Sequence, residues 1–220
     1  HDLRTPLASI GLMAENLGSG FAQGREEVYV SSIQRETARL RRLVDDLLDF
    51  GRLERGLLPN VTRQPVDLAE WLDKVAVRER ARCAAEGTAL SLEVEGVLGF
   101  ASVDAPALER AIANLVDNAL KHGEARSIRM RARQESDAVL AIEVEDAGKG
   151  LGGGSVHEHL FEPFERRSEN EGTGLGLTIV RAIAEAHGGR ATLGAGPGGR
   201  GAIARIEIAG CEAEPREPAA

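Results

Sequence analysis

The chain has 220 residues, of which 42% are hydrophobic and 28% charged, and its formal net charge is −8. This length suits one large or two small domains, and the composition is typical of folded globular proteins, not of disordered ones. The negative charge argues against a nucleic-acid-binding protein, because such proteins contact phosphates through clustered Lys and Arg. Cys83 and Cys211 have neither metal-ligand nor disulfide-framework spacing, which fits the reducing cytoplasm.

No apolar run approaches the roughly 20 residues that cross a bilayer, and the N-terminus lacks a signal-peptide pattern. The sequence begins at His1 within a helical pattern and without Met. We therefore expect a cytoplasmic fragment of a longer protein. Any sensor, or any anchor in the inner membrane, would lie upstream of it.

Residues 1–57 have the pattern of two packed helices. Apolar positions recur in steps of four and three on each side of a glycine-rich turn at residues 18–24. A single helical hairpin buries too little surface to be stable alone, so we expect a homodimer that completes a four-helix bundle. The positions that form this apolar seam are Leu3, Leu7, Ile10, Ala14 and Leu17 in the first helix and Ile33, Thr37, Leu40, Val44 and Leu47 in the second.

A second domain is expected over residues 66–210, after a linker rich in Gly, Pro and Asn. Asp67 is expected to cap its first helix. Uneven alternation of the predicted elements favours an α+β sandwich, with helices on one face of a mixed sheet, and residues 211–220 are expected to be a disordered tail. The periodicity predicts strands near residues 90–94, 128–131, 139–144, 191–193 and 203–208, and helices over 106–121 and 175–187.

Three residues at the start of the chain suggest a nucleophilic site. At about 100° per residue, His1 and Thr5 share the helix face opposite the apolar seam. A histidine with a pKa of about 6.5 is largely neutral at cytoplasmic pH, so one ring nitrogen is available to attack an electrophile. Asp2 could orient the ring and accept its proton. Alone, however, a surface histidine beside an acid is most often a solvated polar face, so this motif needs support from elsewhere.

The predicted helix over residues 106–121 carries a second polar group. Asn114 and Asn118 lie one turn apart and share a face. Their amide oxygens are suitable ligands for a Mg²⁺ that is otherwise held by water and phosphates, and Lys121 could reach a phosphate. The alternative is that the two asparagines only cap or bridge surface groups.

Two glycine motifs follow. Asp146, Gly148 and Gly150 come directly after an apolar strand, where the carboxylate could accept a hydrogen bond from an adenine amino group above the glycines. The second motif opens the last predicted helix, where glycines let the backbone approach phosphates, and consists of Gly172, Thr173, Gly174, Leu175 and Gly176.

The polar segment 151–171 lies between these motifs, and Phe161 and Phe164 could pin one end of it as a mobile lid. A dinucleotide-binding fingerprint is excluded, because the second motif follows a polar segment and not a strand. A zinc site at His157 and His159 is also disfavoured, because neighbours two apart on a helix point in different directions.

Together and in this order, the motifs resemble those of the sensor histidine kinases of two-component signalling, from His1 to about Ile208. The resemblance implies an α-helical hairpin that forms a dimeric four-helix bundle, followed by an α+β sandwich of the Bergerat ATPase and kinase type. It also implies an ATP-dependent protein-histidine kinase that phosphorylates His1. The phosphoryl group would then pass to an aspartate of a response regulator.

By the same resemblance, His1 is the phosphoacceptor, Asp2 is its acid–base partner, and the residue matching Thr5 assists dephosphorylation of the regulator. ATP and Mg²⁺ are the implied cofactors. The remaining roles follow the family's motifs: Asn118 holds Mg²⁺, Asn114 and Lys121 contact phosphates, Asp146 reads adenine, Gly174 and Gly176 shape the return of the lid, and Arg166 poises the lid or the transfer.

Two alternatives stay open on the residues alone. One is another ATPase of the same fold, of the gyrase or chaperone type, which normally offers a glutamate near the asparagine motif to activate water; here Asn114 stands at the one-turn position. The other is a signalling scaffold that binds nucleotide or a partner helix without chemistry.

Overall fold

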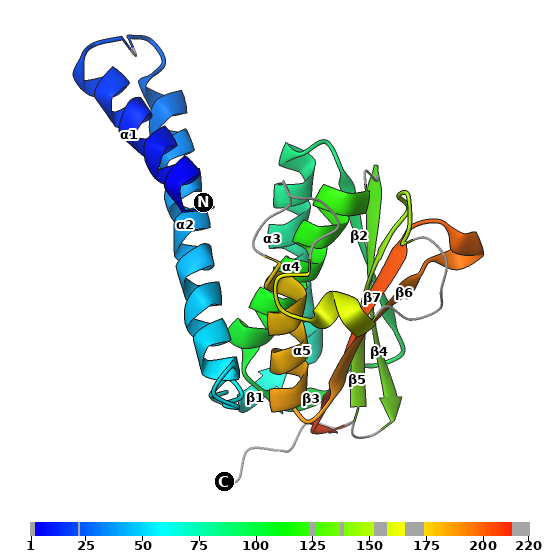
Figure 1. Cartoon of the computed structure of the whole chain (residues 1–220). Helices are drawn as coiled ribbons and strands as arrows, with labels where there is room; N and C mark the ends of the chain where they lie inside the picture. The colour runs from blue at the N-terminus through cyan, green and yellow to red at the C-terminus, as the bar shows by residue number, and fades with distance from the viewer. Residues whose placement is uncertain are drawn as a thin grey trace, which may run out of the picture.

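The structure is a computed structural model that describes residues 3–21, 23–123, 126–136, 139–151, 158–165 and 174–212. It begins with a helical hairpin, α1 (Arg4–Gly18) and α2 (Glu26–Leu53), as the apolar periodicity predicts. Figure 1 shows this hairpin standing away from the rest of the chain, which only the lower end of α2 approaches. Among the described residues, no helix has both the length and the hydropathy to cross a bilayer.

Only part of the hairpin's apolar surface is covered by its own two helices. Pro6 is buried, and Ile10 and Leu17 are half-buried. Leu7, Val44 and Leu47 belong to the predicted seam and yet are 59%, 46% and 42% exposed. Two helices can bury only one stripe each against one another, so the hairpin retains an exposed apolar stripe.

The second unit is a sheet covered on one face by three helices (Figure 1). The strand order is β2-β4-β5-β7-β6, and β2 pairs parallel with β4 whereas the other pairs are antiparallel. This is the predicted α+β sandwich with a mixed sheet. Its helices are α3 (Leu68–Ala85), α4 (Ala105–Gly123) and α5 (Gly176–Ala186), and its strands are β2 (Ala89–Glu95), β4 (Ser127–Ser136), β5 (Val139–Asp146), β6 (Arg190–Ala195) and β7 (Ala202–Ala209).

Alternation along the strands explains why the helices lie on one face. In β5, Ile142 and Val144 are buried in the core, whereas Glu143 between them points to the other face, as the pleat of a strand requires. There Glu143 pairs with Arg205 of β7 at 2.9 Å. The open face of the sheet therefore carries charged cross-strand pairs, and the apolar face carries the helices.

A second, three-stranded antiparallel sheet of order β1-β3-β8 was not predicted. Its strands are β1 (Gln64–Asp67), β3 (Phe100–Val103) and β8 (Cys211–Glu212), all too short for an alternating pattern to be recognised. Strand β8 lies in the segment expected to be disordered, and it is ordered because its backbone pairs with β3. Residues 213–220 lie outside the described residues.

Asp67 caps α3 as predicted, since its Oδ1 accepts hydrogen bonds from the backbone N–H groups of Ala69 and Glu70 at 3.0 and 3.1 Å. The described residues also include two short 3₁₀ helices, η1 (Glu158–Phe161) and η2 (Pro197–Gly199).

Charged and aromatic side chains join the end of α2 to the second unit. Arg110 of α4 pairs with both Asp46, at 2.6 Å, and Asp49. Burial raises the pKa of Asp46 above its ordinary value, an effect that the hydrogen bond from Arg110 partly offsets. The rings of Phe50 and Phe164 meet edge to face, with centroids 4.8 Å apart.

A buried histidine connects the end of α5 to the start of α4. His187, at the end of α5, accepts a hydrogen bond at Nε2 from the N–H of Asp104 at 3.0 Å, so its proton lies on Nδ1, 2.8 Å from the carbonyl oxygen of Ile183. Burial lowers the pKa of His187 below its usual 6.5, and the charge of Arg63 lowers it further. The hydrogen bond to Ile183 and the charge of Asp104 partly oppose this shift. The ring is therefore held neutral.

Candidate nucleotide-binding and phosphoacceptor site

The asparagine motif lies on α4, where the apolar side chains of Leu115 and Val116 are buried against the sheet. This burial fixes which face of the helix turns outward. Asn114 and Asn118 are half-buried on that outer side, one turn apart, and Lys121 is exposed a turn further on. The predicted arrangement of three polar side chains along one helix is therefore present.

The second glycine motif meets the asparagine motif at the first turn of α5. The side-chain amide of Asn114 donates a hydrogen bond to the carbonyl oxygen of Gly176 at 3.4 Å. A Cβ added at Gly176 would lie 3.8 Å from the Asn114 side chain, which is an ordinary contact. The structure thus brings together two motifs that lie about 60 residues apart in the sequence.

Among the described residues of this motif, Gly174 is the position where only glycine fits. Its φ is +70°, and an added Cβ would lie 2.8 Å from the Cα of Phe164. Its carbonyl oxygen accepts a hydrogen bond from the N–H of Phe164 at 3.1 Å. The next residue, Leu175, is fully buried and anchors the start of α5. The chain therefore returns to the helix at a fixed point.

The two phenylalanines hold the segment before this point in different ways. Phe161 is buried in the core, and its carbonyl oxygen accepts a hydrogen bond from the Thr178 hydroxyl at 3.0 Å. Phe164 is half exposed and has a φ of +64°, the one positive φ of a non-glycine residue in the described ranges. Its ring contacts Phe50 of α2, so the aromatic pair pins this segment to the core and also to the hairpin.

The first glycine motif begins where β5 ends, at the buried Asp146. Its Oδ1 accepts a hydrogen bond from the N–H of Gly148 at 2.9 Å, and the carbonyl oxygen of Gly148 accepts one from the N–H of Gly201 at the same distance. Gly150 has a φ of +77° and packs against the carbonyl oxygens of Gly199 and Gly201. The carboxylate orientation is therefore set by the loop that follows the strand.

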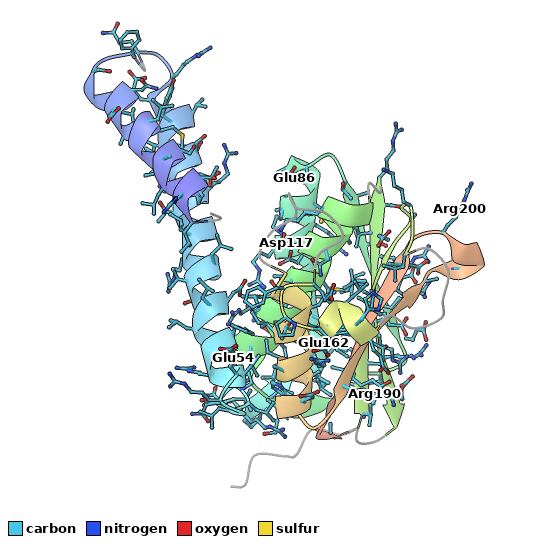
Figure 2. All side chains as sticks on the ribbon, viewed as in Figure 1. Glu54, Glu86, Asp117, Glu162, Arg190 and Arg200 are labelled. Carbon is cyan, nitrogen blue, oxygen red and sulfur yellow. The ribbon has the colours of Figure 1, made fainter. Side chains whose placement is uncertain are left out.

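The turn between β6 and β7 supports this loop, and the sequence did not reveal it. A Cβ added at Gly201 would lie 1.8 Å from the carbonyl oxygen of Asp146, so the two backbones are in direct contact. Arg200, beside it, is exposed and is labelled in Figure 2 at the edge of the molecule. The signal in the sequence was the glycine-rich run 196–201, which pattern analysis treats only as a turn.

Several predicted site residues fall outside the described residues, namely His1, Asp2, Arg166, Gly172 and Thr173. Thr5 lies in the first turn of α1 and is exposed, as expected from its place on the helix face opposite the apolar seam. The roles of all these residues stay predictions. The described remainder forms two groups. Asn114, Asn118 and Lys121 lie along the second half of α4, next to Gly174, Leu175 and Gly176 at the start of α5, and Asp146, Gly148 and Gly150 lie at the end of β5.

The donor set on α4 fits a magnesium ion that is shared with nucleotide phosphates. The side chains of Asn114 and Asn118 supply neutral amide oxygens, which are hard ligands. The neighbouring carboxylate of Asp117 is occupied by an ion pair with Arg82 at 2.9 Å. Sequence reasoning missed Arg82, because nothing in its local pattern shows that α3 packs beside the asparagine motif.

Comparison with known proteins identifies both parts of the chain. Residues 1–56 match the His Kinase A (phospho-acceptor) domain, and residues 103–209 match the histidine kinase-, DNA gyrase B-, and HSP90-like ATPase family. The chain belongs to the sensor histidine kinases. This confirms the family that the motifs suggested, together with the predicted fold.

Individual relatives agree with this assignment. The alginate biosynthesis sensor protein KinB of Pseudomonas aeruginosa is 34% identical over 204 residues, covering 90% of this chain and 34% of KinB. Sensor protein SphS of Synechococcus elongatus is 35% identical over 231 residues, covering 99% of this chain and 53% of SphS. The chain thus spans about a third to a half of the length of these relatives.

Among solved structures, full-length ShkA in complex with AMPPNP has a TM-score of 0.69 and 26% identity, over 86% of this chain and 40% of ShkA.

Proposed function

We propose that this chain is an ATP-dependent protein-histidine kinase that phosphorylates its own His1. The observation that carries the proposal is the presence, on one chain, of a phospho-acceptor hairpin and an ATPase-type sandwich whose asparagine and glycine motifs meet at Asn114 and Gly176. A gyrase-like ATPase does not require a phospho-acceptor hairpin. A scaffold without chemistry does not need the asparagine motif.

ATP would bind between α4, the start of α5 and the end of β5. Asp146 would accept a hydrogen bond from the adenine amino group, since the N–H of Gly148 already fixes its Oδ1. Asn114 and Lys121 would contact the phosphates from α4. Asn118 would hold Mg²⁺, which when bound offsets the charge of the phosphates. The complex of ShkA with AMPPNP supports the binding of ATP by this chain.

Gly172, Thr173, Gly174 and Gly176 would lie beside the phosphates near the N-terminus of α5, where the helix dipole favours negative charge. Gly148 and Gly150 would let the backbone approach the adenine ring. Arg166 would help to poise the lid. These roles rest on the family resemblance and on the described positions of Gly148, Gly150, Gly174 and Gly176.

The chemical step is an in-line phosphoryl transfer. One ring nitrogen of neutral His1 attacks the γ-phosphorus, a nitrogen–phosphorus bond forms, and the bond to the bridging oxygen breaks as ADP leaves. Asp2 accepts the proton from the other ring nitrogen. The phosphoryl group then passes to an aspartate carboxylate of a response regulator, which leaves His1 free again.

The hairpin would act as a homodimer. Its exposed apolar stripe, which includes Leu7, Val44 and Leu47, supports this proposal because a second copy would cover it in a four-helix bundle. The match to the phospho-acceptor domain family agrees with it. Thr5, exposed one turn after His1, would in addition assist hydrolysis of the phosphorylated regulator.

The proposed function is tested by incubating the chain with Mg²⁺ and ATP labelled on the γ-phosphate. We expect label on the protein that is stable in alkali and labile in acid, and its loss in both His1→Ala and Asn118→Ala. ATP labelled on the α-phosphate serves as the control and should leave the protein unlabelled. ATP binding without any label on the wild-type chain would contradict the kinase and favour the scaffold.

Dephosphorylation is tested separately with a phosphorylated response regulator. Thr5→Ala should slow the loss of its phosphate while leaving the labelling of His1 intact. An equal rate with the wild type and the variant would exclude a role for Thr5.

A further inference from the structure

Arg82, an ion-paired residue of α3, contacts α4, the helix that carries the asparagine motif. The Nη1 of Arg82 lies 2.9 Å from Asp117 Oδ1, and its Nη2 donates to the carbonyl oxygen of Ala113 at 3.1 Å. On α3 itself, Nη2 lies 2.7 Å from the carboxylate of Glu79, whose side chain is only 3% exposed. In Figure 2, Asp117 lies on the upper part of α4, near the end of α3 where Glu86 is labelled.

The contacts of Arg82 fall directly beside the two asparagines. Ala113 precedes Asn114 and Asp117 precedes Asn118, so Arg82 contacts α4 at the residue before each amide. A side-chain amide lies roughly 6 Å from the helix axis, so a rotation of about 10° moves it by about 1 Å. Displacement on that scale is enough to remove a ligand from a binding site. Arg82 is therefore placed to fix the rotation of α4.

The same arginine controls the charge next to the site. Asp117 would otherwise present an unpaired carboxylate beside Asn118, where phosphates are expected and negative charge repels them. The guanidinium of Arg82 neutralises it. Glu79 in turn holds the guanidinium in place from α3, because a buried carboxylate requires a cation.

We propose that Arg82 is a positioning residue for Mg·ATP, acting on Asn114 and Asn118 through Asp117 and the Ala113 carbonyl. This inference rests on the proposed nucleotide site. Arg82 itself touches neither nucleotide nor metal. Its loss lowers the affinity for the metal more than the affinity for the metal-free nucleotide, because Asp146, which reads adenine, lies on β5 and not on α4.

Arg78 provides a matched control. It lies one turn earlier on the same helix, pairs with the same buried Glu79 at 3.5 Å, and bridges to α4 through Glu109 at 2.8 Å. Glu109 is more than one turn before Asn114. Replacing either arginine by Gln therefore leaves Glu79 with one cation and removes one bridge between α3 and α4, but only Arg82→Gln acts beside the asparagines.

The experiment measures binding of ATP to wild type, Arg82→Gln, Arg82→Lys and Arg78→Gln, first in EDTA and then over a range of Mg²⁺ concentrations, with thermal unfolding measured in parallel. We expect Arg82→Gln to raise the Mg²⁺ concentration for half-maximal binding about 10- to 100-fold, as loss of a supporting residue at a metal site does. Binding in EDTA should change by less than about threefold, since the adenine contacts are kept. Arg78→Gln should lower the unfolding temperature without shifting the Mg²⁺ dependence.

Arg82→Lys keeps the charge but cannot contact Asp117 and Ala113 together. Its unfolding temperature should therefore be close to that of the wild type, whereas its Mg²⁺ dependence should be shifted almost as far as that of Arg82→Gln. It also carries the test if Arg82→Gln does not fold. Equal Mg²⁺ dependence in the Arg82 and Arg78 variants would overturn the positioning role while leaving the nucleotide site intact. Wild-type binding of ATP that is absent, or indifferent to Mg²⁺, would overturn the proposed function and this inference with it.

Discussion

The contact between the β6–β7 turn and the end of β5 can be tested with two alanine substitutions that differ in one respect. Gly198 and Gly201 lie in the same turn and both have a φ of +67°. A Cβ added at Gly198 meets nothing within 4 Å, whereas one at Gly201 would lie 1.8 Å from the carbonyl oxygen of Asp146. Gly201→Ala must therefore displace the backbone that orients the carboxylate of Asp146, which we propose to bind adenine.

The expected loss of stability has two contributions, the left-handed backbone and the contact with Asp146. The left-handed backbone costs an alanine about 1–2 kcal/mol at either position. Displacing packed backbone adds about 1–3 kcal/mol at Gly201 alone. Gly201→Ala should therefore lower the free energy of unfolding by about 1–3 kcal/mol more than Gly198→Ala. It should also weaken ATP binding, which Gly198→Ala should leave unchanged.

The assay is urea unfolding followed by the fluorescence of Trp71, the one tryptophan of the chain and a buried residue of α3, combined with a nucleotide-binding titration. Equal stabilities and equal ATP affinities for the two alanine variants would refute the argument. That result would mean that the turn does not support Asp146.

Three further predictions concern the rest of the chain. The pKa of His187 in the folded protein lies below its usual 6.5, so the stability that neutral His187 contributes is fully present above pH 6.5 and is lost as the pH falls through the folded-state pKa. The free energy of unfolding should therefore fall more between pH 8 and pH 5 in the wild type than in His187→Gln. Leu47→Glu should dissociate the proposed homodimer in light scattering, whereas Val97→Glu, at an exposed apolar position outside the hairpin, should not. Arg110→Met should speed hydrogen exchange at the end of α2, because Asp46 loses its cation and Asp49 keeps only the longer pair with Arg52 at 3.6 Å; unchanged exchange would show that the Arg110 contact is dispensable.

The helices and the long strands could be predicted because their apolar periodicity is set by burial. Helix α4, expected over 106–121, spans Ala105–Gly123, and the α5 helix expected from Leu175 begins at Gly176. Asp67 could be recognised as a cap from its position before an apolar run. Strands β1, β3 and β8 could not, because two to four residues carry no detectable period and are held by pairing with distant segments.

The site shows the same division. Local motifs pointed to Asn114, Asn118, Asp146 and the glycines of both loops as candidates, because the proposed chemistry needs those residue types at short spacing. Arg82 and Gly201 were not identified. Each acts on a motif far away in the sequence, and only the packing of α3 on α4, or of the β6–β7 turn on β5, places it there.

The central claim is that the phosphoryl group of ATP is transferred to His1. The most direct measurement is mass-spectrometric mapping of the phosphorylated residue, at neutral to alkaline pH, after the protein has been incubated with Mg·ATP. The account predicts phosphate on the peptide that contains His1, on the histidine ring and not on Thr5, and none in Asn118→Ala. Phosphate on another residue, or none on a protein that binds Mg·ATP, would contradict it.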